Sequence, residues 1–157
     1  MRIGVISDTH MAGYDPALAE KTAELFAGVE MILHAGDLTS LEVLDALDAP
    51  EVLAVAGNMD SHVVKANLPG KRVISAGGFK IGLIHGWGSP MGLPSRVVGE
   101  FPGVDAVVFG HSHRPTNIVK QGILLFNPGS YVKGFLGSGS VGILELGQEI
   151  AGRVIKL

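Results

Sequence analysis

The stretch MRIGVISDTH, residues 1–10, sets the pattern on which the fold is built. A short run rich in Ile and Val is typical of a buried strand. This run stops at Ser7, and Asp8, Thr9 and His10 follow directly. The sequence therefore predicts a strand that delivers polar side chains to its carboxyl end.

The next segments repeat this arrangement with helices between the strands. Asp15 followed by Pro16 indicates a helix start, with a capping carboxylate and a proline at the first helical position. Gly28 marks the end of that helix. Strands are predicted at residues 30–34 and 51–56, with a short helix at 41–47. Alternating strands and helices indicate a parallel sheet covered by helices.

The second half of the chain is dominated by hairpin patterns. Paired runs with glycine-containing turns are typical of antiparallel strands. We expect hairpins at 71–76 with 79–85, 117–120 with 123–126, and 140–146 with 149–156, together with a helix at 95–101 and a strand at 104–109. About ten strands are too many for one comfortable sheet. We expect one α/β domain over residues 1–157, in which two facing sheets carry helices outside.

Composition excludes several classes of function. The 157 residues carry a net charge of −3, which gives no global field for wrapping duplex nucleic acid. The apolar runs are too short for a membrane span, and no signal peptide is recognisable. Without cysteine there is no disulfide, thiolate metal site or thiol nucleophile. We expect a cytoplasmic protein that binds a small substrate, and its apolar composition is compatible with homo-oligomers.

Side chains that can bind metals follow five predicted strands. Taken singly, an Asp or His after a strand is usually a turn former or a solvated loop residue. The carboxyl ends of strands in an open α/β sheet meet at one crevice, so we expect these side chains to converge. The seven candidates are Asp8, His10, Asp37, Asn58, His85, His111 and His113.

This set of ligands has a definite chemistry. Two carboxylates, one amide oxygen and four imidazoles are more than one ion needs, and they suffice for two ions if one carboxylate bridges. Two ions about 3.5–4 Å apart are the arrangement that clamps the attacking and leaving oxygens at phosphorus. Imidazole with carboxylate suits Mn²⁺ first, with Ni²⁺, Fe or Zn²⁺ as alternatives.

The same residues give the sequence a recognisable pattern. It resembles the calcineurin-like metallophosphoesterases, whose motifs are D-x-H, G-D, G-N-x-[ED], H-G and G-H-x-H. The chain matches them in order over residues 2–146, and SDTH at the start together with FNPGS at 126–130 is most similar to the small single-domain phosphodiesterase branch. That branch also contains the scaffolding subunit of the retromer coat. The matching segments are Asp8/His10, Gly36-Asp37, Gly57-Asn58-Met59-Asp60, His85-Gly86 and Gly110-His111-Ser112-His113.

The resemblance implies a four-layer αββα sandwich and a dinuclear phosphodiesterase in which a metal-bridging hydroxide is the nucleophile. It also places the loop at 126–130 near the site. Asp37, Asn58 and His85 are the expected catalytic residues. The implied partition puts Asp8, His10 and His113 on one ion and Asn58, His85 and His111 on the other, with Asp37 bridging.

One departure from the family pattern bears on the reaction. Many members carry His after the motif asparagine, where this chain has Met59, and a thioether donates no proton. We therefore favour a phosphodiesterase over a phosphomonoesterase or protein phosphatase. The alternative is a non-catalytic binding or scaffold protein on the same fold. A dinucleotide-binding module is disfavoured because the first strand leads into SDTH, not a G-x-G-x-x-G turn.

Other side chains near the motifs have two interpretations each. Asp60 either orders the Asn58 loop or is a plain turn carboxylate. His34 either packs in the core and supports the site or binds metal directly. Trp87 either walls a pocket or stacks on substrate, and Arg114 either pairs with a phosphate oxygen or faces solvent.

Overall fold

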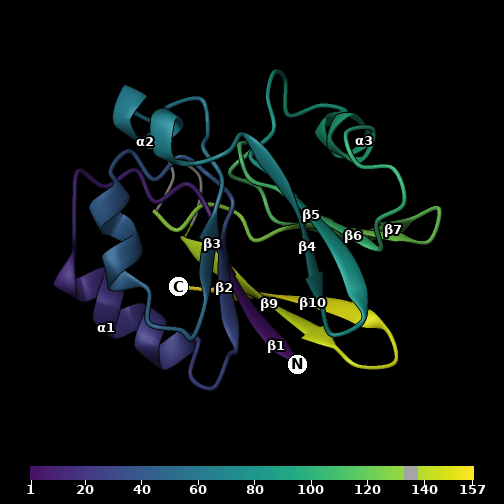
Figure 1. The fold of residues 1–157 in the computed structure, drawn as a ribbon, viewed down its shortest axis with the longest axis horizontal. Helices are drawn as coiled ribbons and strands as arrows, with labels where there is room; N and C mark the ends of the chain where they lie inside the picture. The colour runs from purple at the N-terminus through teal and green to yellow at the C-terminus, as the bar shows by residue number, and fades with distance from the viewer. Residues whose placement is uncertain (133–137) are drawn as a thin grey trace.

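The computed structural model describes residues 1–132 and 138–157, and within this part the chain forms two sheets flanked by helices (Figure 1). The elements in chain order are β1 (Arg2–Ile6), α1 (Pro16–Leu25), β2 (Met31–His34), the 3₁₀ helix η1 (Leu41–Ala46), β3 (Val52–Ala54), α2 (His62–Asn67), β4 (Lys71–Ala76), β5 (Phe79–Ile84), α3 (Leu93–Val98), β6 (Ala106–Val108), β7 (Thr116–Lys120), β8 (Ile123–Asn127), β9 (Ser140–Leu146) and β10 (Ile150–Lys156).

Each sheet has five strands and a parallel centre. The first sheet has the order β10-β9-β1-β2-β3, with β1, β2 and β3 parallel and β9 and β10 antiparallel. The second has the order β4-β5-β6-β8-β7, with β5, β6 and β8 parallel. The carboxyl ends of three parallel strands are therefore aligned in each sheet, which is the arrangement that the motif positions predict.

Three apolar clusters separate four layers. One cluster lies between the sheets and joins, for example, Val5 and Leu33 of the first sheet to Leu83 and Val108 of the second. A second cluster packs the first sheet against α1, η1 and α2. A third packs the second sheet against α3, so that Figure 1 shows α1 and α2 on one side of the sheets and α3 on the other. This is the expected αββα sandwich.

The helices differ more from the sequence expectation than the strands do. Asp15 caps α1 as predicted, accepting hydrogen bonds from the backbone N–H groups of Ala17 at 2.7 Å and Leu18 at 3.3 Å. The helix expected at 41–47 is the 3₁₀ helix η1, whose N-cap Ser40 makes no side-chain capping bond. The helix expected at 95–101 is α3 at Leu93–Val98. The six-residue α2 was not predicted, because one and a half turns give too little apolar periodicity.

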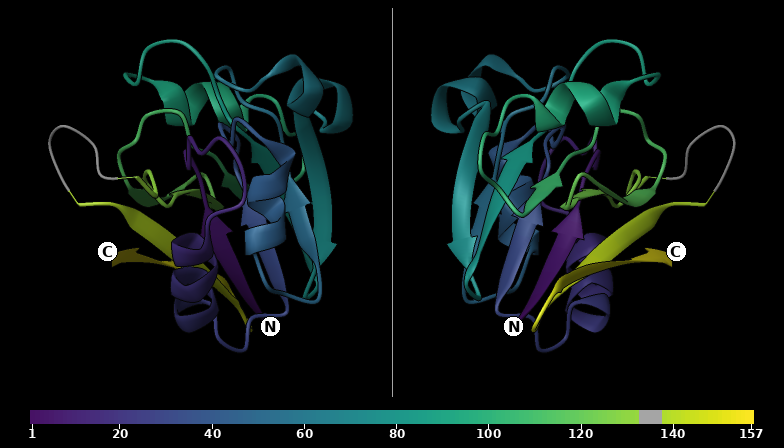
Figure 2. Two further views of the ribbon diagram at one scale, coloured as in Figure 1. Left: turned by 90° about the vertical axis from the view of Figure 1, so that its left-hand side faces the viewer. Right: turned by 90° about the vertical axis from the view of Figure 1, so that its right-hand side faces the viewer.

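The loops that follow the parallel strands are joined to one another by backbone hydrogen bonds. The backbone N–H of Asp8 donates to the carbonyl oxygen of Gly36 at 3.0 Å, and that of His10 donates to the carbonyl oxygen of Asp37 at 3.0 Å. These bonds connect the loops after β1 and β2. In the second sheet, the backbone N–H of Gly110 donates to the carbonyl oxygen of His85 at 3.0 Å. In Figure 2, β1 runs from the N-terminus toward the end of the molecule where α3 lies. None of the helices in the described part of the chain has the length and apolar character needed to cross a membrane.

Candidate metal centre

The first group of candidate ligands surrounds one oxygen of Asp8. The Nε2 atom of His113 lies 3.1 Å from Asp8 Oδ1, and His10 Nε2 lies 3.9 Å from the same oxygen. The two imidazole nitrogens are themselves 3.4 Å apart. Asp8, His10 and His113 thus present three ligand atoms to one point in space.

The second group surrounds His85. Its Nε2 atom lies 3.2 Å from Asp37 Oδ2 and 3.1 Å from Asn58 Oδ1. Asn58 Oδ1 is also 2.9 Å from His111 Nδ1. The two groups meet at Asp8, because Asp8 Oδ1 is 3.9 Å from His85 Nε2 and belongs to both clusters of candidate ligand atoms. All seven predicted side chains are therefore brought together.

The residues present fit divalent metal ions. Asp8 Oδ1 is buried and accepts no hydrogen bond from the described residues, although three imidazole Nε2 atoms lie within 4 Å of it. A buried carboxylate oxygen without a donor is costly unless a cation occupies the space in front of it. Nitrogen and oxygen donors without sulfur suit divalent transition metals.

In two of the histidines, one ring nitrogen is hydrogen-bonded to a backbone carbonyl oxygen, which leaves the other ring nitrogen free to bind an ion. His85 Nδ1 lies 2.7 Å from the carbonyl oxygen of Ala35, which accepts its proton and leaves Nε2 with a lone pair. His111 Nε2 lies 2.8 Å from the carbonyl oxygen of Gly88, so Nδ1 is the free nitrogen there. These assignments follow from the partners, and such hydrogen bonds orient metal-binding imidazoles.

The electrostatics of the cluster show strong mutual stabilisation of opposite charges. The Asp8 carboxylate beside His113 raises the pKa of that imidazole despite its partial burial. Burial lowers the pKa of His85, but the carboxylates of Asp37 and Asp8 outweigh it and raise the pKa overall. Burial raises the pKa of Asp37, yet contact with His85 brings it below the ordinary value. A bound cation would replace the protons on these imidazoles, which makes ion binding dependent on pH.

Backbone strain is concentrated at the ligands. Five of the seven candidates have positive φ angles, a conformation that non-glycine residues seldom adopt. Such strain costs of order 1–3 kcal/mol per residue and persists only where the surroundings enforce it. These residues are Asp8 (54°), His10 (48°), Asp37 (56°), His111 (67°) and His113 (56°).

Three hydrogen bonds hold Asp8 through its other carboxylate oxygen and its backbone oxygen. Ser7 Oγ donates to Asp8 Oδ2 over 2.6 Å, and the backbone N–H of His111 donates to the same oxygen over 3.2 Å. The backbone oxygen of Asp8 accepts from Ser130 Oγ at 3.0 Å. The segment at 126–130 therefore supports the site, as the resemblance implied.

Two glycines are required by close approach to the ligands. A Cβ on Gly57 would collide with Asp37 Oδ1 and would lie 2.6 Å from the Asp37 nitrogen. A Cβ on Gly110 would collide with Ser7 Oγ and would lie 2.8 Å from Asp8 Oδ2. The glycines that precede Asn58 and His111 let neighbouring loops pack directly on the two carboxylates.

Asp60 positions the loops around Asp37 and Asn58. Its buried carboxylate accepts from the backbone N–H groups of Gly57 at 2.6 Å, Asp37 at 3.1 Å and Thr39 at 2.6 Å. The backbone N–H of Met59 donates to Asp37 Oδ1 over 2.7 Å. Of the two interpretations of Asp60, the ordering role is therefore the one that the structure shows.

His34 lies behind the site and supports it. It is fully buried, with Nε2 at 3.0 Å from Thr9 Oγ1 and Nδ1 accepting from the Gly36 N–H at 3.2 Å. Burial lowers the pKa of His34 to about 4. Both ring nitrogens are engaged away from the carboxylates, so the packing interpretation holds.

Two further contacts support the loops of the site. Lys65 on the unpredicted α2 donates from Nζ to the carbonyl oxygen of Asn58 over 2.9 Å. Asn127 Nδ2 donates to the carbonyl oxygen of Gly110 over 2.7 Å. The sequence signal for Asn127 was its place in FNPGS; for Lys65 there was none.

The comparisons with known proteins agree with this geometry. Residues 1–149 match the calcineurin-like phosphoesterase superfamily domain. A probable metallophosphoesterase of Methanocaldococcus jannaschii is 45% identical over 136 residues, which cover 83% of this chain and 68% of that protein.

Two solved structures resemble the whole chain. A structure described as a novel archaeal phosphodiesterase has a TM-score of 0.81 and 25% identity, covering 100% of both chains. Wild-type Vps29 of Entamoeba histolytica, complexed with Zn²⁺, has a TM-score of 0.74 and 26% identity, covering 99% of both chains.

Proposed function

Because the chain belongs to the calcineurin-like phosphoesterase superfamily, we propose that it is a dinuclear metal-dependent phosphodiesterase. The family and the candidate ligand groups together support a metal-dependent phosphoesterase. The number of ions and the preference for diesters are the parts that we add.

One observation carries the two-ion assignment. The ligand atoms form two adjacent groups that share Asp8, and Asp37 lies in the second of them. Two bound divalent ions would supply an activated water and stabilise the charge that develops at phosphorus. The chain contributes the positions: Asp8 and Asp37 would hold the ions, and His85 and Asn58 would complete the second group.

The likeness to an archaeal phosphodiesterase supports the preference for diesters, and residue 59 bears on the leaving group. The Met59 side chain is 62% exposed at the loop that carries Asn58, and its backbone N–H is used by Asp37. A thioether cannot protonate the leaving oxygen, and general-acid help is typically worth about 10²–10⁴ in rate. We therefore expect substrates whose leaving group departs without that help, and activated aryl esters before alkyl esters.

The alternative is a binding or scaffold protein on the same fold. The Vps29 likeness favours it, as do exposed apolar side chains at Met59, Val63, Trp87 and Met91. The strained backbone at five ligand positions favours the enzyme, because a scaffold would gain nothing from this strain.

The decisive experiment measures the initial rate of bis(p-nitrophenyl) phosphate hydrolysis by chelator-stripped protein, alone and after addition of Mn²⁺. We expect Mn²⁺ to restore cleavage, and cleavage of p-nitrophenyl phosphate to remain much slower. Asp37→Asn should abolish the restored activity, whereas Asp48→Asn, an exposed carboxylate outside the cluster, should preserve it. Metal binding without diester cleavage would instead favour the scaffold.

A further inference from the structure

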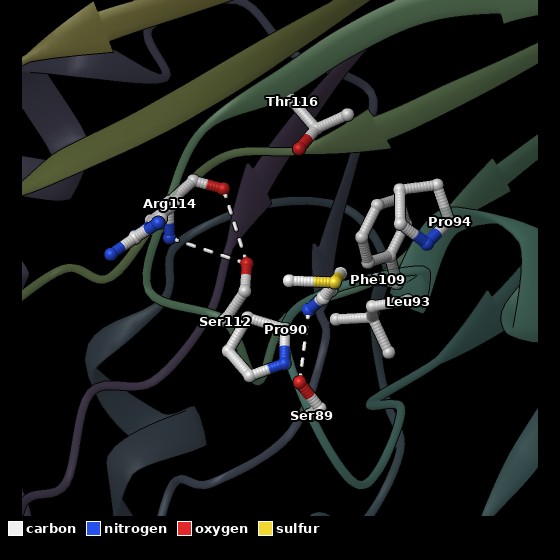
Figure 3. Close-up of a pocket in the computed structure, with 9 residues that line it drawn as sticks. Ser89, Pro90, Leu93, Pro94, Phe109, Ser112, Arg114 and Thr116 are labelled. Atoms are coloured by element: carbon white, nitrogen blue, oxygen red, sulfur yellow. Dashed lines mark hydrogen bonds between the residues drawn. The ribbon is translucent and has the colours of Figure 1, made fainter.

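A pocket of about 470 Å³ lies beside the ligand cluster, a size typical of small-molecule sites (Figure 3). Its walls come from the loop that follows β5, the start of α3, and the loop that follows β6 as far as the start of β7. Ser112, which stands between the candidate ligands His111 and His113, is one of the lining residues. The pocket therefore shares two of its loops with the ligand cluster, whose other members follow β1, β2 and β3.

Much of the pocket wall is apolar. Pro90, Met91, Leu93, Pro94 and Phe109 contribute rings and aliphatic side chains. Figure 3 shows Leu93 and Pro94 on the side of the pocket opposite Arg114. Flat apolar surfaces of this kind favour an apolar ring, because its burial removes apolar area from water.

The charge in the pocket lining is positive. Among the described residues that line it, Arg114 is the only charged one and none is a carboxylate. The hydroxyl groups of Ser112 and Ser89 are engaged with backbone groups of Arg114 and Met91. The Arg114 guanidinium forms no hydrogen bond or ion pair within residues 1–132 and 138–157, so it is free for an anion.

The pocket loop is rigidly tied to the ligand cluster. Arg96 of α3 donates to the carbonyl oxygens of Met91 at 2.9 Å and Trp87 at 3.0 Å, and also to that of Ser89. Between these anchor points, the carbonyl oxygen of Gly88 accepts the Nε2 proton of His111. One loop therefore orients a candidate metal ligand and walls the pocket, which fixes the position of the pocket relative to the reacting centre.

We propose that this pocket binds one esterified alcohol of the substrate, an apolar ring that carries a further anionic group which Arg114 pairs with. This inference rests on the proposed function and adds a substrate class to it. The phosphodiester would lie at the ligand cluster, and the second anion would distinguish the natural substrate from simple diesters.

The kinetic test uses Mn²⁺-loaded protein and two diesters that release the same p-nitrophenolate. One is phenyl p-nitrophenyl phosphate and the other is 4-carboxyphenyl p-nitrophenyl phosphate. A hydrogen bond to a charged group predicts a kcat/KM at least about tenfold higher for the carboxylate. Arg114→Gln should bring the ratio of the two kcat/KM values close to one, whereas Arg153→Gln, exposed on β10, should leave it unchanged.

A ratio near one in the unmodified protein, or a high ratio that survives Arg114→Gln, would overturn the inference.

Cleavage of neither diester would refute the proposed function instead, and a binding measurement then decides about the pocket. Titration of the full chain with 2-naphthoate, followed by ¹H–¹⁵N spectra, should shift the amide signals of the non-proline residues within 89–93 and 112–116. The Kd should be at least about tenfold lower than for 2-naphthalenemethanol, and this difference should vanish in Arg114→Gln. Equal Kd values, or shifts confined to other residues, would contradict the assignment.

Discussion

Two three-residue clusters of the metal centre, Asp8–Asp37–His85 and Asp8–His10–His113, differ in their exposure to solvent, although Asn58 beside the first cluster is itself exposed. Asp8, Asp37 and His85 have side chains that are 0%, 3% and 2% exposed, whereas those of His10 and His113 are 25% and 44% exposed. The buried residues are fixed by hydrogen bonds from both sheets, so they define the geometry before any ion binds. The exposed histidines complete the first group at the side that a substrate can reach.

The largest effect is expected at the residue that the two groups share. Asp8→Asn keeps the shape of the side chain but removes a negative charge from both groups of candidate ligands. We expect kcat/KM for bis(p-nitrophenyl) phosphate to fall about 10³-fold or more, the order lost when a group that stabilises transition-state charge is removed. Circular dichroism serves as the control for folding, and near-normal activity with folded protein would contradict the assignment.

The buried side of the site also has a pH signature. The pKa of His34 is about 4 when folded and about 6.5 when unfolded, so the unfolded state binds more protons in between. The contribution of His34 to the free energy of unfolding is fully present above pH 6.5. It is lost as the pH falls toward 4, by about 3 kcal/mol in all. Urea unfolding of chelator-stripped protein gives the free energy of unfolding at pH 7 and at pH 5. The difference between these two values should be smaller for His34→Gln than for the unmodified protein. An identical difference would mean that His34 does not titrate in this way.

The exposed side is tested by restoring a proton donor at residue 59. Met59→His places an imidazole on the loop of Asn58 without disturbing the backbone bond to Asp37. General-acid catalysis predicts a gain of about 10²-fold for alkyl leaving groups and little change for p-nitrophenolate. Rates with methyl p-nitrophenyl phosphate and dimethyl phosphate separate the two cases. Equal gains for both would show that the change acts on binding.

The smallest effect is expected at Asp60, which acts through the loops and not on the substrate. The two carboxylate oxygens of Asp60 accept hydrogen bonds from three backbone N–H groups, and Asp60→Asn leaves only one acceptor oxygen for them. Metal affinity should fall about tenfold, within the range for residues that orient ligands. Excess Mn²⁺ should then recover most of kcat. A defect that persists at saturating metal would show that Asp60 does more than position the loops.

The sequence predicted those parts of the molecule that depend on local pattern. The strands and their polar ends were predictable because apolar runs stop at Asp8, Asp37 and His85, and parallel strands align such ends. The roles of Arg96 and Lys65 were not, because each depends on a carbonyl group that a separate loop presents. The short α2 was missed for lack of periodicity, and the two interpretations of Asp60 could be separated only by its contacts with backbone groups 21 and 23 residues away.

In the proposed metal centre, the seven side chains hold two ions in two groups that share Asp8. The most direct measurement counts Mn²⁺ or Zn²⁺ ions per chain by equilibrium dialysis and elemental analysis, in the unmodified protein and in His113→Asn. We expect two ions per chain in the unmodified protein and one in the variant, because the cluster of Asp8, Asp37 and His85 keeps its ligands. A single ion in the unmodified protein, or loss of both ions in the variant, would contradict it.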